Sequence, residues 1–75
     1  MADEERLRLE IAFDGGQIMG ALVSPDAASE LERALGSAAQ ETITLDAEDG
    51  RYTLALRRIV YVKRFARESR VGFGA

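Results

Sequence analysis

The first strong pattern in the sequence is an alternation of apolar and polar residues over residues 7–13. A period of two is typical of a strand with one buried face, so we expect the apolar side chains of this stretch to point toward a core. The stretch ends at Asp14-Gly15-Gly16, a hairpin signal because glycine accepts the positive φ that tight turns require. Residues 17–23 are therefore predicted to form the second strand of a hairpin.

The segment SPDAASELERALG predicts a helix over about residues 25–36. Ser24 is a suitable N-cap, and Pro25 fits the first helical position, where its missing N–H costs nothing. Gly36 is expected to end the helix. Apolar residues recur at helical spacing and form one stripe, which consists of Ala27, Leu31, Ala34, Leu35 and Ala38.

A second hairpin follows the helix, with residues 42–47 as one strand and Asp49-Gly50 as the turn. If the next strand kept strict alternation beyond Leu56, it would point Arg58 into the core, where an unpaired charge is very costly. We therefore expect a bulge or bend at Arg57-Arg58. The fold class is α+β with the order ββαββ. One helix packs on one face of an antiparallel sheet that is strongly twisted or partly closed, and the last strand is bent at Arg57-Arg58.

Two strands carry apolar residues on both faces, which is one face more than a single helix can cover. In the second strand, Ile18 and Leu22 lie on one face while Met19 and Val23 lie on the other, and residues 59–62 are apolar throughout. A continuous apolar run is normally covered on both sides. The sheet either curls into a small barrel or packs its second face on another subunit. The candidate self-association residues are Met19, Val23, Tyr61, Val71 and Phe73.

The length of 75 residues predicts a single domain, 1–75, with an ordered core over about 6–66 and a C-terminal tail over 67–75. A domain of this size buries a modest fraction of its surface, and the chain has no cysteine and no histidine. Disulfides and the usual transition-metal ligands are thus missing, which leaves association as the remaining source of stability. We expect a homo-oligomer, with a dimer favoured, and neither a cofactor nor enzyme activity.

Charge is distributed unevenly along the chain. Residues 1–50 carry a net charge of −9, and residues 51–75 carry a net charge of +6. Cations interleaved with aromatic residues suit single-stranded nucleic acid or another polyanion. The candidate polyanion-binding residues are Arg57, Arg58, Lys63, Arg64, Arg67 and Arg70. An acidic protein partner would suit the same cations. The interpretation that we favour is that they face acids of their own fold.

The sequence begins with charged residues where a signal peptide would need an apolar segment, and no stretch is long and apolar enough to cross a membrane. We therefore expect a cytoplasmic protein that does not contact a membrane.

Two stretches, FDGGQIMGALV and LRRIVYV, resemble the hairpin and closing strand of Sm-like small β-barrels. Over about residues 7–65 the chain more closely resembles small uncharacterised bacterial ββαββ domains with a DG hairpin, a short helix and a final I-x-x-V strand. This resemblance implies a fold and a bacterial origin but no activity. The expected function is that of a small non-enzymatic, self-associating interaction module, and the alternative is nucleic-acid or polyanion binding.

Overall fold

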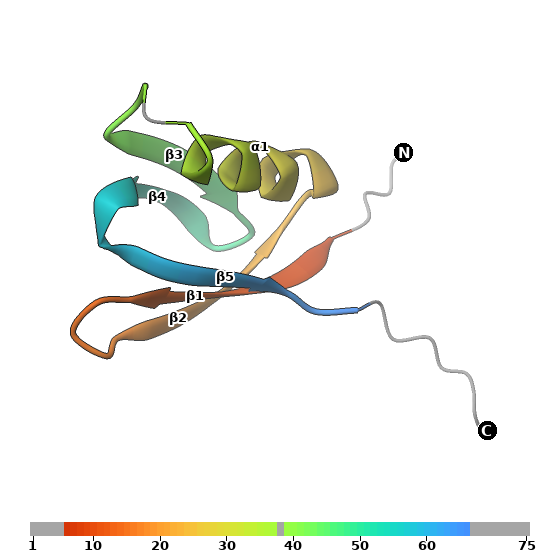
Figure 1. The fold of residues 1–75 in the computed structure, drawn as a ribbon. Coiled ribbons are helices and arrows are strands. Elements are labelled where there is room, and N and C mark those ends of the chain that lie inside the picture. Colours follow the sequence, from red (N-terminus) through yellow and green to blue (C-terminus); the bar gives the residue numbers. More distant parts are fainter. Residues whose placement is uncertain (1–5, 38, 67–75) are drawn as a thin grey trace.

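The structure, a computed structural model, describes residues 6–37 and 39–66 of the 75-residue chain (Figure 1). This part is a small α+β domain with five antiparallel strands and one α-helix. In chain order its elements are β1 (Leu7–Phe13), β2 (Ile18–Val23), α1 (Pro25–Leu35), β3 (Thr42–Ala47), β4 (Gly50–Ala55), the 3₁₀ helix η1 (Leu56–Arg58) and β5 (Ile59–Arg64). The predicted tail, 67–75, lies outside the described residues.

The first strand of the chain, β1, lies inside the sheet, whose order is β4-β3-β2-β1-β5. β1 pairs with β2 on one side and with β5 on the other. β4 and β5 are the two edges and do not pair with each other, so the sheet is open. The sequence predicted one last strand bent at Arg57-Arg58. The structure instead has two strands there, β4 and β5, which lie on opposite edges of the sheet.

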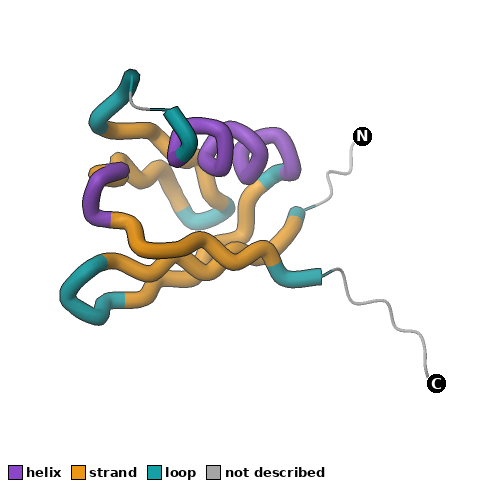
Figure 2. The backbone as a smooth tube through the Cα atoms, in the orientation of Figure 1, coloured by secondary structure: helices purple, strands orange, loops and turns teal. Residues whose placement is uncertain are grey.

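The turn η1 is the reason that these two strands separate. The carbonyl of Leu56 accepts a hydrogen bond from the N–H of Ile59, which closes a tight turn between β4 and β5 (Figure 2). The turn breaks the alternation just before Arg58 would point inward. Leu56 stays buried, and Arg58 lies exposed beside Asp14. The cost of burying an arginine is thus avoided by a change of direction at the expected position.

Strands β2 and β3 meet at one end only. Their ladder contains a single residue pair, Val23 with Ala47, and the N–H of Glu48 adds a 2.9 Å hydrogen bond to the carbonyl of Leu22. The part of β2 that precedes Leu22 extends past the turn between β3 and β4. The β3–β4 hairpin is therefore joined to the rest of the sheet by a narrow connection, and packing on α1 and on η1 supplies further contact.

The helix begins as predicted, with the hydroxyl of Ser24 accepting a 3.1 Å hydrogen bond from the N–H of Ala27. It ends at Gly36, which has φ −88° and thus does not use the left-handed conformation open to glycine. The buried stripe differs from the expected one. Ala28 is fully buried, whereas Leu35 is 37% exposed at the last turn.

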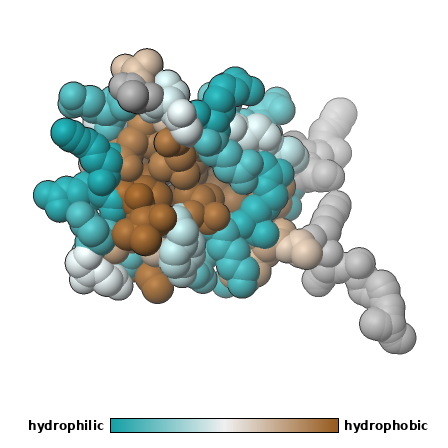
Figure 3. All heavy atoms as spheres, viewed as in Figure 1, coloured by the Kyte–Doolittle hydropathy of each residue, from teal (hydrophilic) through white to brown (hydrophobic). Residues whose placement is uncertain are grey.

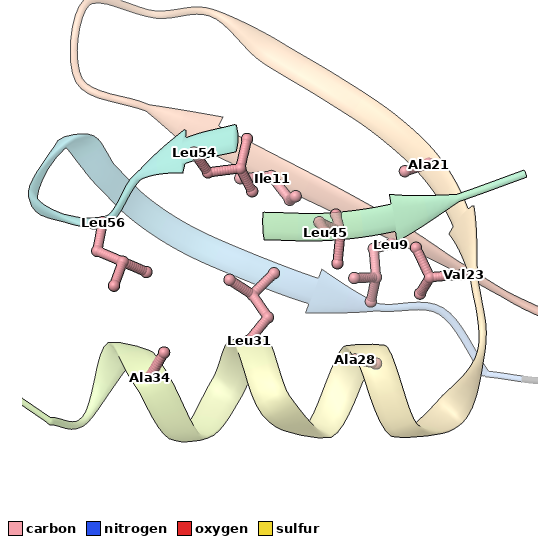
Figure 4. Packing of buried hydrophobic residues seen from close by; sticks show 10 residues of the cluster. All are labelled: Leu9, Ile11, Ala21, Val23, Ala28, Leu31, Ala34, Leu45, Leu54 and Leu56. Carbon is pink, nitrogen blue, oxygen red and sulfur yellow. The ribbon is translucent and has the colours of Figure 1, made fainter. Parts of the chain in front are cut away.

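The core lies between α1 and one face of the sheet (Figure 4). Leu31 points from the helix toward the strands, and its side chain is fully buried. Leu9 and Ile11 meet it from β1, as the alternation predicted, and Leu45 meets it from β3. Ten buried residues form this cluster: Leu9, Ile11, Ala21, Val23, Ala28, Leu31, Ala34, Leu45, Leu54 and Leu56.

The two faces of β2 are assigned differently from the sequence interpretation. Val23 is fully buried in the core, and Met19 packs against the same cluster. Ile18 and Leu22 lie on the opposite face, with 60% and 41% of their surface exposed. The pairing of Val23 with Leu7 explains this result, because directly opposed residues share a face and Leu7 is on the core side of β1.

Candidate interaction surface

The side of β2, β1 and β5 that points away from α1 is here called the outer face. Its first row crosses three strands, because Ala12 of β1 pairs with Ile18 of β2 and with Tyr61 of β5. Ala12 is only 7% exposed although no helix of the described residues covers this side. Its larger neighbours shield it and remain exposed themselves, so the row is apolar and open to solvent.

An irregularity in β5 enlarges this apolar row. Ala12 pairs with Tyr61 but the next residue of β1, Phe13, pairs with Ile59, so Val60 is an extra residue in the ladder. Such a bulge lets Ile59 and Val62 both pack against the core. The two residues between them point away from it, and Val60 is 63% exposed. We define the outer patch as Ile18, Val60 and Tyr61 around Ala12.

The middle row of the outer face is polar. Glu10 of β1 lies between Gly20 and Lys63, and its carboxylate accepts a 2.6 Å hydrogen bond from the phenol of Tyr61. This hydrogen bond raises the pKa of Tyr61 above its ordinary value, with smaller contributions from burial and from the charge of Glu10. The phenol of Tyr61 is thus held in place over β1 while the residue as a whole remains 43% exposed.

The third row combines cations with an aromatic ring. Arg8 pairs with Leu22 of β2, and its carbonyl accepts a 3.0 Å hydrogen bond from the N–H of Phe65. The guanidinium of Arg8 lies 4.9 Å from the centre of the Phe65 ring, and the ammonium of Lys63 lies 4.5 Å from it. Both distances are within the range of cation–π attraction. The ring is therefore engaged by two cations of its own chain.

Beside this row the surface has a shallow hollow of about 380 Å³. It is lined by Arg8, Gly20, Ala21, Leu22, Glu48 and Asp49. The hollow forms because β2 extends past the β3–β4 turn, where Gly20 contributes no side chain. Its charges are mixed, with one cation and two acids.

The four candidate polyanion-binding residues in the described part of the chain do not converge on one surface. Arg58 pairs with Asp14 at 3.3 Å, and Arg64 pairs with Glu32 of α1 at 3.1 Å. Arg57 is exposed in η1, whereas Lys63 lies on the outer face. Arg67 and Arg70 lie outside the described residues. Two of the four described cations thus face acids of the fold.

The candidate self-association residues are also separated. Val23 is in the core and Met19 packs against it, so the inference that these two form a docking face is corrected by the burial of β2. Tyr61 is exposed on the outer face. In β2, however, the sequence interpretation assigned the surplus apolar residues to the side of Met19 and Val23, whereas the exposed ones lie on the side of Ile18 and Leu22. Val71 and Phe73 lie outside the described residues.

The interpretation of the sequence missed Ile18, Leu22 and Val60 as surface residues. β2 is apolar on both faces, so its own pattern does not show which face is buried. The signal that could have decided it is the length of the first hairpin. With a turn at Asp14-Gly15-Gly16, the strands pair Leu7 with Val23, and this assigns Val23 to the core face.

Within residues 6–37 and 39–66, no group of three or more His, Cys, Asp or Glu side chains could hold a metal ion. No helix in this part of the chain is long and apolar enough to cross a membrane.

The chain matches no protein-family model, no curated protein and no solved structure. The resemblance to small bacterial domains and to Sm-like barrels therefore stays a prediction.

Proposed function

We propose that this protein is a small non-enzymatic interaction module that self-associates through the outer patch. The observation that carries the proposal is the exposure of Ile18, Val60 and Tyr61, at 60%, 63% and 43%. These side chains lie on adjacent strands around the shielded Ala12, so they form one apolar surface. Contiguous apolar patches of this kind often mark sites of protein association.

The size of the domain supports the same proposal. The core of the described residues has ten members, three of them alanines on α1 and β2, and a domain of this length buries only a modest fraction of its surface. Small domains without disulfides or metals often gain stability from association. Covering the outer patch with a second copy would add apolar burial on the side of the sheet that α1 does not reach.

The chemistry of the chain supports a role in binding more than one in catalysis. There is no histidine and no cysteine in the sequence, so the commonest general base and the most reactive nucleophile are missing. The two described hydroxyl–carboxylate contacts of tyrosines, Tyr61 with Glu10 and Tyr52 with Asp49, both raise the pKa of the phenol. A raised pKa makes a phenol a weaker proton donor at neutral pH, which fits a structural role.

Sedimentation velocity of the full chain over a concentration series up to the millimolar range tests the proposal. We expect a concentration-dependent dimer. The variant Ile18→Gln should dissociate at a concentration at which the wild-type chain is dimeric, because a polar amide loses hydrophobic burial in the interface. Leu35→Gln is the matched control, since Leu35 is also exposed but lies at the end of α1. A wild-type chain that stays monomeric throughout the series rules the proposal out.

The alternative function is polyanion binding, through nucleic acid or an acidic protein. It is favoured by the exposed Arg57 and by Lys63 and Arg8 around the Phe65 ring. It is opposed by Glu10 in the middle of the same face and by the acids that pair with Arg58 and Arg64. Titration of labelled single-stranded RNA and DNA across a salt series tests it. Phosphate contacts predict a log–log slope of about −0.7 per contact, and no binding at low salt removes the alternative.

A further inference from the structure

The outward edge of β5 is open for backbone pairing. In the described chain β5 pairs with β1 alone, and the N–H of Phe65 donates to the carbonyl of Arg8 at 3.0 Å. Backbone groups of successive residues in an antiparallel strand point alternately to its two sides. Lys63 and Tyr61 therefore bond toward β1 like Phe65, whereas the N–H and C=O groups of Val62 and Arg64 point out of the sheet.

The two edges of the sheet differ in the side chains that they present. No residue of β4 is among the exposed large hydrophobic residues of the described chain, whereas Val60 and Tyr61 of β5 both are. On the inner side of β5, Ile59 and Val62 pack against the core and remain half-buried. Figure 3 shows apolar side chains gathered between β5 and α1, with hydrophilic ones around them. A strand added beside β5 would cover apolar groups on both faces.

Cations often protect edge strands from pairing, and β5 carries two of them. Both are occupied within the fold. The guanidinium of Arg64 bonds to Glu32 on α1 at 3.1 Å, so its side chain lies toward the helix. The ammonium of Lys63 lies over the Phe65 ring on the outer face. Neither side chain is held across the open backbone groups of Val62.

We propose that a second copy of this chain pairs its β5 antiparallel to this edge, in the register that places Val62 opposite Val62. This inference rests on the proposed self-association, and it places the contact at the β5 edge beside the outer patch and not over the patch. In this register the two Val62 residues exchange both backbone hydrogen bonds. The outer patches of the two copies then lie next to each other on one continuous sheet.

Charge selects this register over its neighbours, because like charges directly opposite each other destabilise a strand pair. Centring the pair on Lys63 would oppose two lysines, and centring it on Tyr61 would place Lys63 opposite the apolar Ile59. Centring on Val62 places Lys63 opposite Tyr61 of the second copy. The phenol of Tyr61 is neutral and already donates to Glu10, so each lysine lies opposite a polar group and not a second cation.

Cysteine cross-linking tests the register directly, because the natural chain has no cysteine. Opposed Cα atoms of a hydrogen-bonded pair lie about 5.5 Å apart, which is within the usual span of a disulfide. The variant Val62→Cys should form a covalent dimer under mild oxidation. Thr53→Cys is the matched control, because Thr53 is exposed on the β4 edge. This variant should remain largely monomeric. Circular dichroism verifies that both variants fold.

Hydrogen exchange of the unmodified chain gives a second measurement that needs no substitution. The amides of Val62 and Arg64 should exchange about tenfold more slowly when nine-tenths of the chains are paired, because they exchange from the unpaired copy. The amides of Tyr61 and Lys63, which bond to β1, should not change with concentration.

The outcomes separate this inference from the proposed function. Efficient cross-linking of Val62→Cys together with concentration-dependent protection of Val62 supports the edge pairing, and dissociation of the Ile18→Gln variant supports the outer patch. A chain that self-associates without either result overturns the edge pairing and leaves association through the outer patch standing. A chain that remains monomeric overturns both.

Discussion

The phenol of Tyr61 donates a 2.6 Å hydrogen bond to the carboxylate of Glu10 on the neighbouring strand. These residues are far apart in sequence, and the pairing of Glu10 with Lys63 brings them together. The contact holds Tyr61 on the outer face and connects an apolar row to a polar one. It therefore gives a spectroscopic signal for the surface that we propose as the interface.

The first prediction concerns the titration of Tyr61. Its hydrogen bond to Glu10, followed by burial and by the charge of Glu10, raises its pKa above the ordinary value. The folded state therefore holds this proton more tightly than the unfolded state. The stabilisation from the contact should be present below about pH 10 and should be lost as the pH rises through the raised pKa.

Ultraviolet absorbance can follow this titration. The measurement is best made in a Tyr52→Phe background, because the pKa of Tyr52 is also raised, by its hydrogen bond to Asp49. In that background Glu10→Gln should move the pKa of Tyr61 down toward the ordinary value. An unchanged titration curve after Glu10→Gln would show that the contact is not formed in solution.

The second prediction concerns the core. Leu31 is fully buried and is the largest side chain that α1 contributes to the core cluster. Leu31→Ala should lower the free energy of unfolding by about 2–5 kcal/mol, since it removes buried methyl groups and leaves a cavity. Urea unfolding followed by circular dichroism measures the change. Leu35→Ala, at the exposed end of the same helix, should cost much less, and equal losses would contradict the packing of α1.

The third prediction contrasts two glycines. Gly50 has φ +148°, a conformation that residues with a Cβ atom rarely adopt, although there is space around it. Gly20 has an ordinary conformation, and an added Cβ would lie 3.8 Å from the carbonyl oxygen of Leu9, a normal contact. Gly50→Ala should therefore destabilise the fold by about 1 kcal/mol or more, and Gly20→Ala should be nearly neutral. Thermal unfolding of both variants would reveal whether the order is reversed.

The fourth prediction concerns the ion pair between Arg64 and Glu32, which connects β5 to α1. Their side chains are 36% and 45% exposed, so solvent screens the attraction. A double-mutant cycle with Arg64→Gln and Glu32→Gln should give a coupling energy of about 0.2–1 kcal/mol that decreases with added salt. A coupling of zero at low salt would mean that the pair does not fix the position of β5.

Several elements of this fold could be predicted from local patterns. The hairpin turn at Asp14-Gly15-Gly16, the N-cap at Ser24 and the buried alternation of β1 each depend on residues close together in the chain. Local chemistry determines such features, since a turn needs positive φ and a helix needs its first N–H groups satisfied. The structure agrees with the sequence interpretation at these positions.

The remaining features depend on distant pairing, which local patterns do not encode. The buried face of β2 follows from its register with β1, and the exposure of Val60 follows from a bulge opposite Ala12. The cost of burying Arg58 correctly predicted a change of direction. It did not indicate that β5 would continue at the far edge of the sheet, because that depends on which strand is left to pair with β1.

The position of β1 in the sheet has a consequence for the order of folding. β1 needs β5 as its second neighbour, and these strands lie at opposite ends of the described chain. During synthesis the first hairpin can form early, but one side of β1 has no partner until β5 has left the ribosome. Pairings between such distant segments slow folding, because a long loop must close before the contact is gained. The acquisition of β5 is therefore the step at which a nascent chain of this protein is most open to wrong strand pairing.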